Sequence, residues 1–187
     1  VFAGLGIPLL AVALAQKTHS PDLLIAVEGG SIGAEIIPGK LPISTNEMRV
    51  AHRATMLPCI TDLFLLAQRG FLDVGFVGGA QIDRYGNLNS SVVGQYSKPT
   101  VRLPGSGGAN DIISLCRRVF VVTKHERRRF VNEVDFITSP GFLTGGSSRQ
   151  EAGLVFGRVV RVVTDLGILG FDEQTKAMRL EGVHPGV

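Results

Sequence analysis

A short apolar run that ends in a carboxylate and two glycines constrains this chain most. The residues Leu23 to Val27 lie between Pro21 and Glu28, and Gly29 and Gly30 follow. Apolar runs of this length, bounded by Pro and Gly, are typical of strands buried on both faces. The sequence therefore places Glu28 at the carboxyl end of a strand, the edge at which open α/β sheets bind ligands. A charged strand end that turns into solvent is the alternative, and this feature alone does not decide between them.

Strands alternate with helices in the first half of the chain and cluster in the second. After a strand end at Val1 to Ala3 and a glycine turn, the pattern predicts helices at Pro8–Lys17, Leu57–Arg69 and Asp111–Arg117. Strands are predicted at 71–77, 119–123, 134–137, 159–164 and 177–180, with loops at 29–45 and 141–153. This order predicts one α/β domain over residues 1–187, with a mainly parallel sheet, helices on both faces and some antiparallel strands.

Composition excludes several classes of function. With 187 residues and 44% hydrophobic residues, the chain can bury a sizeable core. A net charge of +3, 6% aromatic residues and no Trp do not favour nucleic acid as a partner. No apolar stretch is long enough to span a membrane, and no signal peptide is indicated. Cys59 and Cys116 suggest neither a disulfide nor a zinc site, so we expect a reducing, cytoplasmic location and no metal.

The chain lacks the common nucleotide and hydrolase motifs. The turn at Gly4 and Gly6 has Leu9 where a dinucleotide fingerprint needs its third glycine. Neither a GxxxxGK[ST] phosphate loop nor a GxSxG nucleophile elbow occurs. We therefore interpret the first turn as a tight strand-to-helix connection whose amides face the same crevice as Glu28.

Two glycine clusters converge on the same sheet edge. Three glycines in four positions precede a predicted helix, in the segment Gly105-Ser106-Gly107-Gly108-Ala109-Asn110. Bare backbone N–H groups in such a segment bind an oxyanion or a phosphate, although a flexible turn is the alternative reading. The second cluster ends the strand at 71–77. It contributes candidate substrate-pocket residues together with those after Glu28, namely Gly29, Gly30, Gly78, Gly79, Ala80 and Gln81.

A basic run follows the strand predicted at 119–123. The residues are Lys124-His125-Glu126-Arg127-Arg128-Arg129. Such a run is usually a solvated face or a subunit contact, which is the reading we favour, while attraction of phosphates or of an acidic partner is the alternative.

These motifs together resemble the class I CoA-transferase family, and most of all the β subunits of its glutaconate CoA-transferases. The resemblance spans nearly the whole chain and is carried by residues 4–9, 20–30, 78–90, 105–110, 125–130 and 138–141. It implies the CoA-transferase (NagB/RpiA-like) α/β fold, a homologous α subunit as partner, and extra segments before Val1 and after Val187. It also implies that Glu28 is the nucleophile and that Gly105 to Ala109 serve the acyl oxyanion and CoA. Gly29 departs from the family, whose members carry Ser or Asn there.

The function implied by the resemblance is transfer of CoA between an acyl-CoA and a (di)carboxylic acid through a glutamyl-CoA thioester on Glu28. Coenzyme A is then a substrate, and no permanently bound cofactor is expected. An acyl-CoA thioester or ring-cleaving hydrolase on the same fold is the alternative. A non-catalytic ligand-sensing domain fits less well because Glu28 is present.

Overall fold

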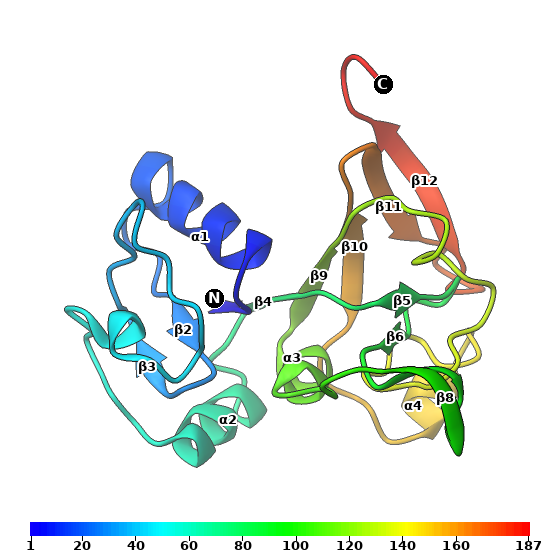
Figure 1. Cartoon of the computed structure of the whole chain (residues 1–187), viewed down its shortest axis with the longest axis horizontal. Coiled ribbons are helices and arrows are strands. Elements are labelled where there is room, and N and C mark those ends of the chain that lie inside the picture. Colours follow the sequence, from blue (N-terminus) through cyan, green and yellow to red (C-terminus); the bar gives the residue numbers. More distant parts are fainter.

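The computed structural model describes residues 1–187 and is built around one eight-stranded sheet (Figure 1). Its strand order is β12-β11-β10-β9-β4-β1-β2-β3. The five central strands are parallel, namely β1 (Phe2–Ala3), β2 (Ala26–Val27), β4 (Val74–Val77), β9 (Arg118–Val122) and β10 (Val159–Val163). The outer strands are antiparallel to their neighbours, namely β3 (Ser31–Ile32), β11 (Gly167–Phe171) and β12 (Met178–Val183). The predicted fold class is confirmed.

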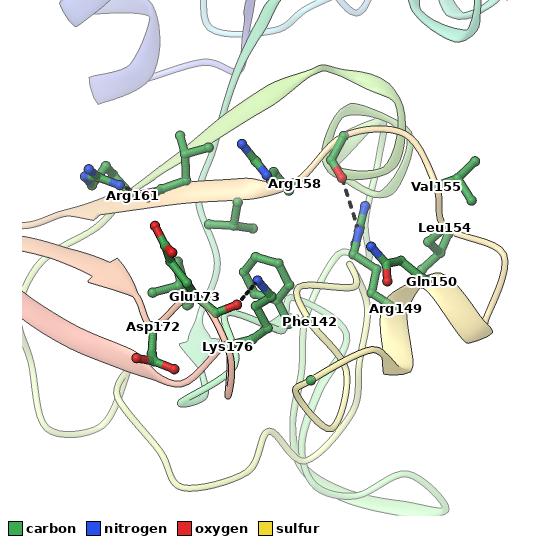
Figure 2. Close-up of a pocket in the computed structure, with 15 residues that line it drawn as sticks. Phe142, Arg149, Gln150, Leu154, Val155, Arg158, Arg161, Asp172, Glu173 and Lys176 are labelled. Carbon is green, nitrogen blue, oxygen red and sulfur yellow. Dashed lines mark hydrogen bonds between the residues drawn. The ribbon is translucent and has the colours of Figure 1, made fainter.

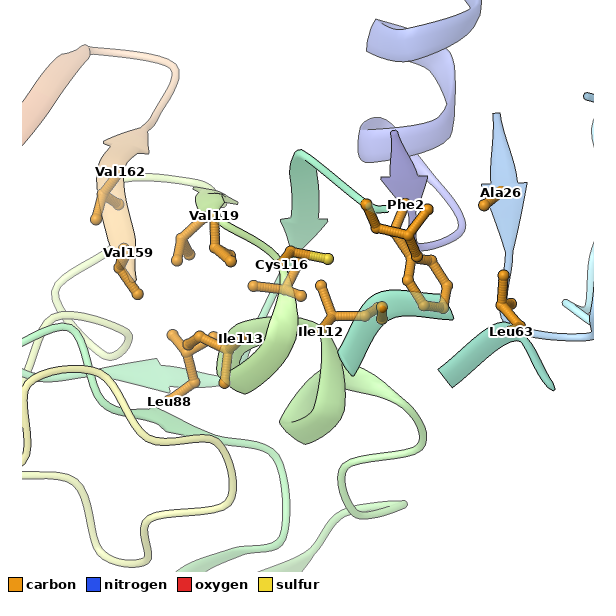
Figure 3. Close-up of a cluster of buried hydrophobic side chains, with 14 of the residues drawn as sticks. Phe2, Ala26, Leu63, Leu88, Ile112, Ile113, Cys116, Val119, Val159 and Val162 are labelled. Atoms are coloured by element: carbon orange, nitrogen blue, oxygen red, sulfur yellow. The ribbon is translucent and has the colours of Figure 1, made fainter. Parts of the chain in front are cut away.

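Helices cover both faces of this sheet, as predicted. The α1 helix (Ile7–Thr18) lies on one side of the strands, and α2 (Ile60–Gln68) and α3 (Ala109–Leu115) lie on the other (Figure 1). Successive residues of a strand point to opposite faces, so Phe2 packs with Leu63 of α2 while Ala3 packs with Leu9 of α1. Figure 3 shows the first of these two clusters, in which Ile112 lies among the side chains beneath the sheet.

The parallel strands bring four connections to one edge of the sheet. The segments after β1, β2, β4 and β9 all leave the carboxyl ends of parallel strands. These are the segments that contain Gly4, Glu28, Gly78 and Lys124. No helix of the chain combines the length and apolarity that crossing a bilayer requires. The architecture therefore places chemically different segments side by side at a single edge.

The strand predicted at 134–137 is wrong. This segment runs past β5 (Gln81–Ile82) without a strand partner. The Asp135 N–H donates to the side-chain oxygen of Gln81 at 3.2 Å, and the Asp135 carboxylate accepts from the Gln81 amide at 2.9 Å. Side-chain hydrogen bonds thus replace the backbone ladder that a strand would need.

Several short elements lie in segments predicted to be loop. Residues 81–104 fold into two hairpins, which pair β5 with β6 (Leu88–Asn89) and β7 (Val92–Gln95) with β8 (Lys98–Arg102). The loops predicted at 29–45 and 141–153 contain β3 and α4 (Ser148–Glu151), and β11 was not predicted. Residues 48–51 form a single 3-10 turn, η1 (Met48–Ala51). The α2 helix begins at Ile60 because Pro58 biases the preceding residue, Leu57, towards an extended conformation.

Candidate active site

Glu28 lies directly after β2, at the turn that leads into β3. The Gly30 N–H donates to the Val27 carbonyl at 2.9 Å and closes this turn. Gly30 has a φ of 99°, a left-handed conformation that glycine adopts without strain. The Glu28 side chain is half-buried. A tight turn therefore presents a carboxylate at the carboxyl edge of the sheet while keeping it accessible from one side.

A backbone amide of the second glycine cluster fixes the orientation of this carboxylate. The Gly108 N–H donates to Glu28 Oε1 at 2.9 Å, across 80 residues of sequence. Gly108 has an ordinary φ of −80°, so its backbone does not require glycine. Space does, because a Cβ atom at Gly108 would lie 2.8 Å from the ring of Phe64 and 3.0 Å from the carboxyl carbon of Glu28. The glycine allows the backbone to approach the carboxylate closely enough to donate.

Gly107 borders the same carboxylate with a free donor. Its φ is 49°, and a Cβ atom there would lie 3.4 and 3.5 Å from the two carboxylate oxygens of Glu28. The Gly107 N–H donates to no protein acceptor. Gly105, with a φ of 97°, donates its own N–H to the Ser90 carbonyl at 2.8 Å. The glycine cluster thus forms a turn with one amide bound to Glu28 and one unpaired amide next to it.

Replacing Gly108 with alanine is expected to destabilise the protein by about 1–3 kcal/mol, because the added methyl group overpacks the contact with Phe64 and Glu28. Chemical denaturation of the whole protein measures the change in free energy of unfolding. Gly182→Ala is the matched control, since nothing lies within 4 Å of a Cβ atom there and its φ is ordinary. Equal stability of the two variants would show that the Glu28 carboxyl group moves aside freely.

One cavity of about 490 Å³ gathers the segments that leave the parallel strands. Five of the predicted site residues line it, namely Glu28, Gly78, Gly79, Ser106 and Ala109. Gly4 and the first residues of α1 also line it, so the first strand-to-helix turn faces the same crevice as Glu28. The convergence expected from the sequence is present in the fold.

Four predicted pocket residues do not line this cavity. A Cβ atom at Gly29 would lie 2.0 Å from the Thr45 carbonyl oxygen, and one at Gly30 would lie 2.2 Å from the Pro58 carbonyl oxygen, so both glycines pack against other backbone. Gln81 is buried, and its side chain is bound to Asp135 and Asn89. Ala80 directly precedes β5, and its N–H donates to the Asn89 carbonyl at 2.9 Å.

The remaining residues of the second glycine cluster are placed around the cavity rather than in its wall. Gly107 and Gly108 contact the Glu28 carboxyl group from the side, and Gly105 turns the chain before them. Asn110 is exposed, and its side chain accepts a hydrogen bond from Ser114 at 3.4 Å.

Two cations of the basic run line the cavity, which the sequence pattern did not predict. Arg129 donates from Nη1 to the Gly79 carbonyl at 3.1 Å and from Nε to the Glu126 carboxylate at 3.1 Å. Arg128 and Arg129 both hydrogen-bond the Glu126 carboxyl group and hold its pKa below the usual value. Lys124 lines the cavity at the end of β9. Its position at the end of a parallel strand was the available signal.

A second cavity, of about 330 Å³, lies between α4 and the strands β10 and β11 and contains none of the predicted site residues (Figure 2). Arg149 lines it but is itself buried, with 4% of its surface exposed. Its guanidinium donates to five backbone carbonyls, those of Ile113, Pro140, Gly141, Phe156 and Gly157. Burial lowers the pKa of Arg149 to about 10. Its role is to join loops.

Comparison with known proteins identifies relatives along the whole chain. Residues 1–187 match the sequence profile described as Coenzyme A transferase. One of the two subunit types of 3-oxoadipate CoA-transferase from Pseudomonas knackmussii is 41% identical over 187 residues, which are 100% of this chain and 71% of that protein. The corresponding subunit of glutaconate CoA-transferase from Acidaminococcus fermentans is 38% identical over 192 residues, which cover 99% of this chain and 71% of that one.

Structure and a more distant relative extend the comparison. The crystal structure of glutaconate coenzyme A-transferase from Acidaminococcus fermentans superposes with a TM-score of 0.90 at 36% identity, over 99% of this chain and 72% of that one. The IpdB component of the cholesterol ring-cleaving hydrolase from Rhodococcus jostii is 30% identical over 183 residues, which are 97% of this chain and 67% of that protein. With a family profile matched from end to end and a shared fold, this chain belongs to the coenzyme A transferase family.

Proposed function

We propose that this chain is the β subunit of a CoA-transferase and that Glu28 carries CoA covalently between two acids. The observation that carries the proposal is the Glu28 carboxylate, oriented by the Gly108 N–H in the wall of the cavity at the carboxyl edge of the sheet. The relatives named above as CoA-transferases share the family and the fold. A carboxylate fixed in this way needs only a thioester within reach to act as a nucleophile.

The proposed reaction proceeds through two covalent states of Glu28. A carboxylate oxygen attacks the thioester carbonyl, the C–S bond breaks, and the CoA thiolate leaves an acyl-glutamyl anhydride. The thiolate then attacks the glutamyl carbonyl, the first acid leaves as a carboxylate, and a glutamyl-CoA thioester remains. A second acid attacks this thioester, and the same steps in reverse return Glu28 and release the new acyl-CoA.

The site geometry assigns different tasks to the two carboxylate oxygens. Oε1 accepts the Gly108 N–H, whereas Oε2 accepts no hydrogen bond from the protein and is the oxygen we assign to attack. Each step passes through a tetrahedral oxyanion. The unpaired Gly107 N–H beside the carboxylate is the donor we assign to this charge, and one such donor is worth about 3–4 kcal/mol.

A second subunit completes the site in this proposal. Both CoA-transferase relatives are single subunits of enzymes that contain more than one kind of chain, and the cavity beside Glu28 is open on one side. Hydrolysis of the anhydride or of the thioester would waste the activated acyl group, so the site must exclude water during both steps. We propose that a homologous α subunit supplies the missing wall.

A dicarboxylic acid is the acceptor we propose. The two CoA-transferase relatives are named for 3-oxoadipate and glutaconate, and both of these acids carry two carboxylates. A ring-cleaving hydrolase is the second candidate, favoured by the relative of that activity from Rhodococcus jostii.

Trapping of the covalent thioester tests the proposed function. The protein in its native assembly is incubated with candidate acyl-CoAs and reduced with borohydride, and peptide masses locate the modified residue. We expect reduction of a thioester at Glu28, together with release of free CoA that depends on an acceptor acid. Release of CoA at full rate without any acceptor would favour the hydrolase, and an unmodified Glu28 would contradict the proposed mechanism.

A further inference from the structure

We propose that Arg129 binds the remote carboxylate of the acceptor acid and thereby selects dicarboxylic over monocarboxylic acids. This assignment rests on the proposed function, because it concerns the acid that attacks the glutamyl-CoA thioester on Glu28. Arg129 and Glu28 line the same cavity although they come from different segments of the chain.

The separation between the two residues suits a small diacid. The Arg129 guanidinium is bound to the carbonyl of Gly79, two residues after β4 ends at Val77. In the sheet, β1 lies between β4 and β2, the strand that ends beside Glu28. Neighbouring strands lie about 4.8 Å apart, so the two strand ends are about 10 Å apart. With both side chains reaching into the space between them, one acid can contact both residues.

Arg129 is held in place with part of its guanidinium unpaired. Nη1 donates to Gly79 and Nε donates to Glu126, while Nη2 has no protein acceptor. The side chain is 28% exposed, so this edge of the guanidinium is open to the cavity. A planar guanidinium with free N–H groups matches the geometry of a carboxylate, and fixing it beforehand reduces the entropy lost on binding.

The charge on Glu126 does not neutralise Arg129. The same Glu126 oxygen accepts from Arg128 at 2.7 Å and from Arg129 at 3.1 Å, so two guanidinium groups share one carboxylate. Lys124 is the other cation of the cavity wall. It also lies near Asp165, whose carboxyl pKa is lowered first by the His125 N–H and further by the charge of Lys124. Arg129 is therefore the cation we assign to the substrate.

The proposed chemistry makes the cavity more positive at the moment the acceptor binds. Glu28 is the one acidic residue in the cavity wall, facing Lys124 and Arg129. Formation of the glutamyl-CoA thioester removes the negative charge of Glu28 and leaves both cations. An acid with a second carboxylate gains from this field, whereas a monocarboxylic acid must place an apolar end there.

The phosphates of CoA are a less suitable ligand for Arg129. The long pantetheine arm separates these phosphates from the thioester, whereas Arg129 lies on the wall that also carries the reacting Glu28. A group that contacts Arg129 therefore belongs to the acyl part of the substrate.

The test compares two acceptors on the protein in its native assembly. A dicarboxylic acid and the monocarboxylic acid of equal carbon number are offered with the same acyl-CoA donor, and kcat/KM is measured for each. Arg129→Gln is expected to lower the preference for the dicarboxylic acid about 10- to 100-fold, the value of a charged hydrogen bond. Arg127→Gln makes the same change of charge at an exposed neighbour outside the cavity and is expected to leave the preference unchanged.

Three results would overturn the assignment, and they are distinguishable. If Arg129→Gln lowers both activities equally, the residue is structural. If its loss disappears when an acyl-pantetheine replaces the acyl-CoA, the contact is to the CoA phosphates. If the unaltered protein transfers CoA to neither acid, the proposed function itself fails and this assignment fails with it.

Discussion

Glu28→Gln is expected to lower CoA transfer at least about a thousandfold while leaving the fold intact. The glutamine oxygen can still accept the Gly108 N–H, so the side chain keeps its position. An amide, however, cannot attack a thioester and return as a leaving group in the way that a carboxylate does. Steady-state transfer between an acyl-CoA and a free acid measures the effect.

Glu35→Gln is the matched control for this prediction. Glu35 lies in the segment after β3, forms an exposed ion pair with Arg53 at 3.1 Å and does not line the cavity beside Glu28. We expect its removal to change transfer little. Full activity in Glu28→Gln would contradict the proposed nucleophile, whereas equal losses in the two variants would point to a general effect of charge.

Arg149→Met is expected to destabilise the protein by about 3–5 kcal/mol, the largest effect on stability that we predict. Arg149 donates to five backbone carbonyls, and methionine can satisfy none of them. Buried carbonyls that lose their donors lose hydrogen bonds that water cannot replace. The measurement is the free energy of unfolding of the whole protein in chemical denaturant.

Arg158→Met separates this effect from the loss of a positive charge. Arg158 borders the same cavity, but its side chain is exposed and makes no hydrogen bond to the protein (Figure 2). We expect its replacement to stay within about 0.5 kcal/mol of the unaltered protein. If both variants unfold alike, the hydrogen bonds of Arg149 contribute no more than a surface charge does.

The position of Glu28 was predictable because its causes are local. An apolar run and the glycines after it determine where a strand ends, and parallel strands bring their carboxyl ends to one edge wherever they lie in the chain. The meeting of Glu28 with Gly79 and Ser106 followed from that rule. The same rule places the end of β9, and with it Lys124, at the cavity.

Other parts of the site depend on contacts that no local pattern encodes. Gln81 was expected in the pocket because it follows Gly78 and Gly79, but Asp135 and Asn89 bind its side chain inside the protein. The same contact with Asp135 removed the strand predicted at 134–137. Arg129 reaches the cavity because its backbone pairs with the chain at Ile82, whose N–H donates to the Arg129 carbonyl at 2.7 Å. Such long-range pairings are decided by tertiary packing, which overrides local propensity.

The hydrogen bond between Gly108 and Glu28 has a consequence for the order in which this protein folds. Its two partners are 80 residues apart, so a chain emerging from the ribosome carries Glu28 long before its donor has been synthesised. Contacts of such high sequence separation form late, because closing the loop between them costs entropy first. The oriented carboxylate is therefore a property of the completed fold. A nascent or partly unfolded chain holds the same glutamate as an ordinary solvated side chain, and unproductive reactions of acyl-CoA are limited to the time after folding.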